Sequence, residues 1–164
     1  MFSRILAAVV LMASVALTME VAVAETSLPS QESFYAAREA FYKGNFEPIR
    51  AYWVQKLAWY EEAMQDEFDS EKFAAGMKAG GHSVTSEDIR RAHELSRSMS
   101  EVLFQPPAAE AARWLGDLSC LHLKYGEAVK YYRRAVELQP QNPKYAAELK
   151  KAIASAADMH QPID

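Results

Sequence analysis

Apolar residues recur three and four positions apart along most of the chain. This spacing is typical of amphipathic helices, whereas strands alternate apolar and polar side chains. No run of alternating β-branched residues favours a strand. The pattern therefore predicts an all-α protein. The expected helices cover about residues 31–43, 48–64, 70–77, 86–105, 108–123, 127–138 and 143–157.

Capping residues and helix breakers set the expected ends of these helices. Ser30 is suited to begin the first helix, and Gly44 to end it in a left-handed conformation. Thr85 and Asp88 have the spacing of a capping box. Pro106-Pro107 is expected to stop the helix that follows Thr85, because proline has no N–H to donate. The face expected to be buried in that helix carries Ile89, Ala92, Ser96, Met99 and Leu103.

The first 24 residues have the three-part layout of a secretory signal peptide. Arg4 supplies a positive start, residues 5–17 are almost wholly apolar, and Ala22-Val23-Ala24 is a small-residue cleavage site. An uncleaved membrane anchor is the alternative, but the apolar run is short and Glu20 interrupts it. A mature chain is therefore expected over residues 25–164 as a single helical domain without a membrane span. The periplasm is the expected location, with secretion as the other possibility.

Composition narrows the classes of function. The chain has 164 residues, a net charge of −4, 6 Gly and 1 Cys. An acidic chain does not favour nucleic acid as a partner. A single thiol excludes an intrachain disulfide framework and a cysteine-built zinc site.

A repeat signature lies near the C-terminus, in EAARWLGDLSCLHLKYGEAVKYYRRAVELQPQNP. Leu115-Gly116, then Ala128 and Tyr132, and finally Ala135 and Pro140 match the L-G, A-x3-F and closing-proline positions of a 34-residue helix–turn–helix unit. The stretch over residues 109–142 resembles a tetratricopeptide repeat. The resemblance implies a short right-handed α-solenoid of antiparallel helix pairs. It also implies that Gly116 and Ala128 are small because two helices approach closely there, with Tyr132 filling the wedge beside them.

One repeat cannot bury its own face, so flanking units are expected. Residues 33–57 resemble a degenerate tetratricopeptide or Sel1-like unit, with its turn at residues 42–46. Residues 143–157 are suited to cap the array, with Tyr145 on their apolar side and Glu148 on their charged side. Residues 64–105 fit neither pattern, and either an insertion or an eroded unit would account for them.

The chain offers few candidates for catalysis. No pair of histidines has metal-ligand spacing, and there is no nucleophile elbow, phosphate loop or dinucleotide fingerprint. His93 is interpreted as a core or boundary residue, and Cys120 as a buried, inert thiol. The acidic stretch over residues 61–71 lacks the spacing of a calcium loop. The sequence therefore predicts a protein that is not an enzyme and needs no metal or cofactor.

The resemblance instead implies a concave, peptide-binding groove lined by the first helix of each unit. Its lining residues, carried over from the repeat pattern, are Arg38, Phe41, Tyr42, Glu110, Arg113, Asp117, Leu121 and Lys151. Arg113 is expected to be exposed there, so that reversing its charge would affect binding and not folding.

The predicted function is an adaptor or assembly factor that holds a peptide or helix of another protein of the cell envelope. One alternative is an accessory structural subunit of an envelope complex. The other is a periplasmic enzyme or solute binder that uses residues 64–105.

Overall fold

The computed structural model describes residues 27–65 and 68–163, and within them the chain is all-α. The predicted signal peptide lies outside the described residues. Where the structure describes the chain, it forms helices and no strand, which confirms the expected fold class. The helices are α2 (Gln31–Tyr42), α3 (Glu47–Gln65), α4 (Ser70–Ala79), α5 (Ser86–Leu121), α6 (Tyr125–Leu138) and α7 (Pro143–Asp158).

Local sequence signals set most of the helix ends. The Ser30 side chain accepts a hydrogen bond from the Ser33 amide at 3.1 Å and so begins α2. Thr85 and Asp88 form the predicted capping box at the start of α5. Gly44, just after α2, has a φ of +85°, a conformation that glycine adopts without strain.

The expectation that Pro106-Pro107 stops a helix is wrong. Helix α5 runs without a break for 36 residues and contains both prolines. The prolines cannot donate to the carbonyls of Val102 and Leu103, but these residues lie on an exposed part of the helix, where water can replace the missing donors. Beyond the prolines, tertiary packing holds the helix, because four alanines there are fully buried: Ala108, Ala109, Ala111 and Ala112.

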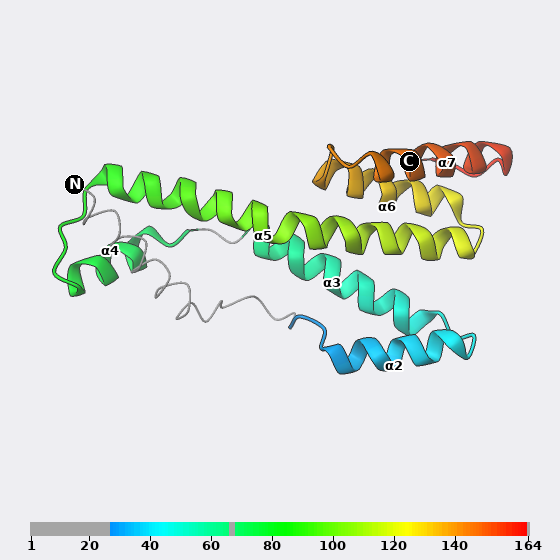
Figure 1. The fold of residues 1–164 in the computed structure, drawn as a ribbon, viewed down its shortest axis with the longest axis horizontal. Helices are drawn as coiled ribbons and strands as arrows, with labels where there is room; N and C mark the ends of the chain where they lie inside the picture. Colours follow the sequence, from blue (N-terminus) through cyan, green and yellow to red (C-terminus); the bar gives the residue numbers. More distant parts are fainter. Residues whose placement is uncertain (1–26, 66–67, 164) are drawn as a thin grey trace.

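Helix α5 is the central helix of the arrangement (Figure 1). Its C-terminal half packs between α3 and α6, while α2 packs on the outside of α3 and α7 on the outside of α6. The main core lies where α3, α5 and α6 meet, and Leu57, Leu115 and Leu138 contribute to it. None of these described helices combines the length and apolar character needed to cross a membrane.

The N-terminal half of α5 projects beyond the other helices and is accompanied mainly by α4 (Figure 1). Of the face expected to be buried here, only Ala92 is buried, whereas Met99 and Leu103 are exposed. The reason is tertiary: α6 and α7 do not extend along this half, and α4 makes few contacts with it, so the described helices cover only part of the apolar stripe.

The close approach that the repeat pattern implies is present between α5 and α6. A Cβ atom on Gly116 would lie 2.6 Å from the Tyr132 ring, so no larger residue fits there without displacing that ring. Ala128, on the facing helix, is fully buried. Both positions are therefore small for the packing reason that the sequence predicted.

Helix α7 covers an apolar face of α6. Ala152 and Ala156 of α7 pack against Ala128, Val129 and Tyr132 of α6 in one buried cluster. The chain after α7 turns back onto the start of α6. There the side-chain amide of Gln161 accepts from the Gly126 amide at 3.0 Å and donates to the Leu123 carbonyl at 2.6 Å. The C-terminal segment therefore closes one end of the helix stack.

Deletion of residues 143–164 is expected to cause aggregation, because it exposes the face of α6 that carries Val129 and Tyr132. Size-exclusion chromatography of the truncated chain would show material in the void volume. A soluble, monomeric truncation would contradict the role of α7 as a cap.

Candidate functional site

The predicted groove residues lie in three places. Arg38, Phe41 and Tyr42 belong to α2, Lys151 belongs to α7, and the other four belong to the C-terminal half of α5. Tyr42 and Leu121 are among the most exposed apolar side chains of the described residues, at 78% and 63%. Phe41 is half-buried and contacts Phe46 edge-on, with ring centroids 5.0 Å apart.

Arg113 is buried, and the expectation that it carries an exposed charge is wrong. Only 9% of its side chain is accessible to solvent. Its guanidinium group donates to both oxygens of Glu110, at 2.7 and 3.0 Å, and to Asp117 one turn later. The pattern identified the right neighbours, since Glu110, Arg113 and Asp117 do lie together, but Arg113 acts beneath the surface as their shared counter-ion.

Two tyrosines from other helices complete this ionic network. The Tyr132 hydroxyl of α6 donates to Asp117 at 2.6 Å, and the Tyr145 hydroxyl of α7 donates to Glu110 at 3.2 Å. Arg113 lowers the pKa of the Glu110 carboxyl mainly through its hydrogen bonds. Burial, followed by the bond to Asp117, raises the pKa of Tyr132 far above its usual range. The phenols thus stay protonated as donors, and the network ties α5 to α6 and α7.

A line of ring contacts, the first edge-on and the second stacked, connects α2 to this network. The Phe34 ring of α2 contacts Trp53 of α3 at 6.1 Å, and Trp53 stacks on Trp114 of α5 at 5.7 Å and 11°. The Arg113 guanidinium lies 4.5 Å from the centre of the Trp114 ring. We call Phe34, Trp53, Trp114 and Arg113 the stacked line.

Part of the stacked line is accessible to solvent. Trp114 is 39% exposed, and two cations lie over neighbouring rings. Arg38 is 5.1 Å from the Tyr35 ring centre, and Lys56 is 5.1 Å from that of Trp53. Rings and long cations of this kind offer a large contact area that loses little side-chain freedom on binding.

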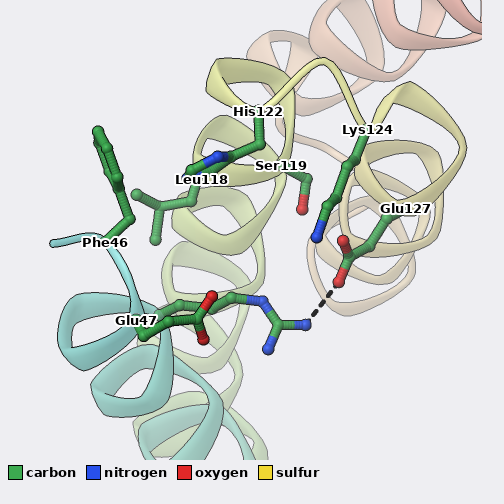
Figure 2. Close-up of a pocket in the computed structure, with 8 residues that line it drawn as sticks. Phe46, Glu47, Leu118, Ser119, His122, Lys124 and Glu127 are labelled. Carbon is green, nitrogen blue, oxygen red and sulfur yellow. Dashed lines mark hydrogen bonds and ion pairs between the residues drawn. The ribbon is translucent and has the colours of Figure 1, made fainter. Parts of the chain in front are cut away.

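A small pocket lies where the start of α3 meets the turn between α5 and α6 (Figure 2). Phe46 and His122 meet edge-on at 4.6 Å, and Arg50 forms an ion pair with Glu127 at 2.6 Å. The cavity has a volume of only about 30 Å³. That is room for about one water molecule. The Arg50–Glu127 ion pair at this pocket connects α3 to α6.

A larger, open cleft of about 500 Å³ lies between the ends of α3 and α6 and the projecting half of α5. Arg134 on one wall is paired with Glu61 and Glu137, and Arg97 on the other is paired with Glu101. His93 also lines the cleft. It is exposed and stacks on Phe68 at 5.7 Å, so its interpretation as a core or boundary residue is wrong.

Two kinds of catalytic group can be assessed directly, the single thiol and a metal-binding cluster. Cys120 is half-buried, and burial raises the pKa of its thiol, which makes it a poor nucleophile at neutral pH. Over residues 27–65 and 68–163, no three His, Cys, Asp or Glu side chains gather closely enough to hold a metal ion.

Several residues of this site were not among the predicted groove residues. Trp114 sits in the repeat's first helix, but its stacking on Trp53 depends on how α3 crosses α5. Tyr145 and Glu148 follow the expected faces of their helix, yet nothing in the pattern links them to Arg113. The sequence contains one weak signal for the contact between Tyr145 and Glu110. The last helix carries a tyrosine on its apolar face, and an earlier helix carries the pattern Glu-x-x-Arg.

Comparisons with known proteins add no assignment to this geometry. No protein-family model matches the chain. No curated protein and no solved structure matches it either.

Proposed function

We propose that this protein is a non-catalytic interaction module of the tetratricopeptide type that binds a peptide or helix of another protein. With the predicted signal peptide, its partner would belong to the cell envelope, and the periplasm is its proposed location. The close packing of Gly116 on Tyr132 agrees with the helix pairing that this family uses. The proposed binding face runs across α2 and the C-terminal half of α5.

The main support for this proposal is the stacked line together with the exposed aromatic and cationic side chains beside it. Arg38 of α2, a predicted groove residue, lies 6.0 Å from the centre of the Phe34 ring. From Phe34 the line reaches Arg113 of α5, another predicted groove residue, through ring contacts of 6.1, 5.7 and 4.5 Å. Exposed aromatic and cationic groups on a rigid base are typical of residues that dominate protein interfaces. Trp114 is held in place before a partner arrives, because it stacks on Trp53 and lies against the buried Arg113.

Arg38→Glu is expected to weaken partner binding at least tenfold and to leave folding unchanged. Arg38 is exposed and lies over the Phe34 and Tyr35 rings, so its loss removes about 0.5–1 kcal/mol of cation–π stabilisation. Reversing its charge at an interface removes a donor and adds repulsion. A pull-down of the mature protein from its own envelope fraction identifies the partner, and titration calorimetry measures the affinity.

The matched control is Arg91→Glu on the projecting half of α5. Arg91 is 71% exposed, pairs with Glu87 and lies away from the stacked line. This variant should bind like the wild type. Equal losses in both variants would mean diffuse electrostatic attraction, and wild-type affinity in Arg38→Glu would place the partner elsewhere.

A second candidate function is solute binding in the open cleft, which falls in the region of residues 64–105. Its volume is within the range of small-molecule sites, about 300–1,000 Å³, and its walls carry histidine, serine and arginine side chains. Thermal-shift screening of the mature chain against polar small molecules separates the two proposals. A stabilising ligand whose effect is lost in Arg97→Ala, and kept in Arg38→Glu, would favour the cleft.

A further inference from the structure

One carboxylate beside the network around Arg113 has an oxygen that accepts no hydrogen bond from the described residues. Glu148 projects from α7 toward α5, and its Oε2 atom is buried and accepts no hydrogen bond from the described residues. Its other oxygen lies 4.0 Å from the Lys144 ammonium, at the limit of an ion pair. A buried acceptor without a partner destabilises the folded state, so this position calls for an explanation.

Within the described residues, the Oε2 atom of Glu148 lacks a donor because the donors of Arg113 and of two tyrosines bond to two other carboxylates where α7 contacts α5. Three carboxylates lie here, from Glu110, Asp117 and Glu148, but Arg113 bonds only the first two. The two tyrosine hydroxyls also serve these two carboxylates: Tyr132 donates to Asp117, and Tyr145 donates to Glu110. Of the three carboxylates, Glu148 is thus the one that receives no hydrogen bond from Arg113, Tyr132 or Tyr145.

We propose that Glu148 is a pH-sensitive latch, whose protonation strengthens the docking of α7 on α5. Protonation removes the surplus negative charge beside Asp117 and Glu110 and turns a buried acceptor into a potential donor. Since α7 covers Val129 and Tyr132, this apolar face of α6 would be held closed more firmly in mild acid than at neutral pH.

The expected pH dependence follows from the groups that face Glu148. Burial, together with the charges of Asp117 and Glu110, raises its pKa, and these effects exceed the opposing ones of Lys144 and Arg113. A carboxyl with a raised pKa contributes stability at low pH that is lost as the pH rises through its folded-state value. Glu110 behaves in the opposite way, because its pKa is lowered, and its contribution is lost as the pH falls. Docking of α7 should therefore be firmest in mild acid, between these two transitions.

The test compares the wild type with Glu148→Gln, which has the shape of the protonated acid and no charge. In the wild type, hydrogen-exchange protection of the α7 amides, corrected for intrinsic rates, should be several-fold higher at pH 5 than at pH 7. In Glu148→Gln this difference should vanish, and the Tm at pH 7 should rise by a few °C. The control, Glu71→Gln on the exposed surface of α4, makes the same chemical change and should keep the wild-type difference.

A direct titration gives an independent check. Carbon-13 NMR of the side-chain carboxyl should show Glu148 titrating above the ordinary value for glutamate. A midpoint at or below that value would overturn the proposal. So would an unchanged pH difference in Glu148→Gln, or a variant that is less stable than the wild type at both pH values, because the carboxylate would then be a needed anion.

Discussion

Ala128→Trp is expected to destabilise the protein by more than about 3 kcal/mol and to lower its Tm by at least about 6 °C. Ala128 is fully buried in the α6–α7 cluster, beside Tyr132 and Ala152. An indole ring has no room there unless α7 moves away, which would uncover the cluster. Thermal unfolding followed by circular dichroism at 222 nm measures the change.

Ala154→Trp is the matched control, because Ala154 lies on the exposed side of α7. The same added volume should there change the Tm by less than about 2 °C. An unchanged Tm in Ala128→Trp would mean that α6 and α7 do not pack as described.

Arg113→Glu is expected to destabilise the protein by about 3 kcal/mol or more, which is a drop in Tm on the order of 10 °C. The variant removes the shared counter-ion of Glu110 and Asp117 and buries a third negative charge between them. It also removes the cation above Trp114. Because Glu110 and Asp117 are partly exposed, with 44% and 30% of their side chains accessible, water screens part of the effect.

This result would differ sharply from that of an exposed arginine. Arg91→Glu reverses a charge that is 71% exposed, so its Tm should stay within about 2 °C of the wild type. Chemical denaturation of both variants provides the comparison. If Arg113→Glu were as stable as Arg91→Glu, the ionic network would not hold α5 against α6 and α7.

Local chemistry predicted much of the fold. Ser30, Thr85 and Asp88 cap the helices that they were expected to cap, because a cap needs only residues within one turn of it. The short link between α6 and α7 ends at Pro143, again as expected. The prediction for Pro106-Pro107 was wrong because it needed more than local information. Whether a helix continues through two prolines depends on what the segments on either side pack against.

The candidate site was predicted less completely. Helical spacing brought Glu110, Arg113 and Asp117 together correctly, since they are three and four residues apart. It could not show that Arg113 is buried, because that depends on Tyr145 and Glu148, which approach from α7. The peptide-binding groove itself stays a prediction.

The sequence by itself determined the helical class and most of the helix ends, since each follows from spacing or from local hydrogen bonding. The small residues where α5 meets α6 were implied by the resemblance to the repeat. Only the tertiary structure decided that α5 is one long helix, that Arg113 is a buried counter-ion and that Trp114 stacks on Trp53. These features join residues far apart in the chain. Their free energy comes from burial and ion pairing between helices, and no local pattern specifies which helices will meet.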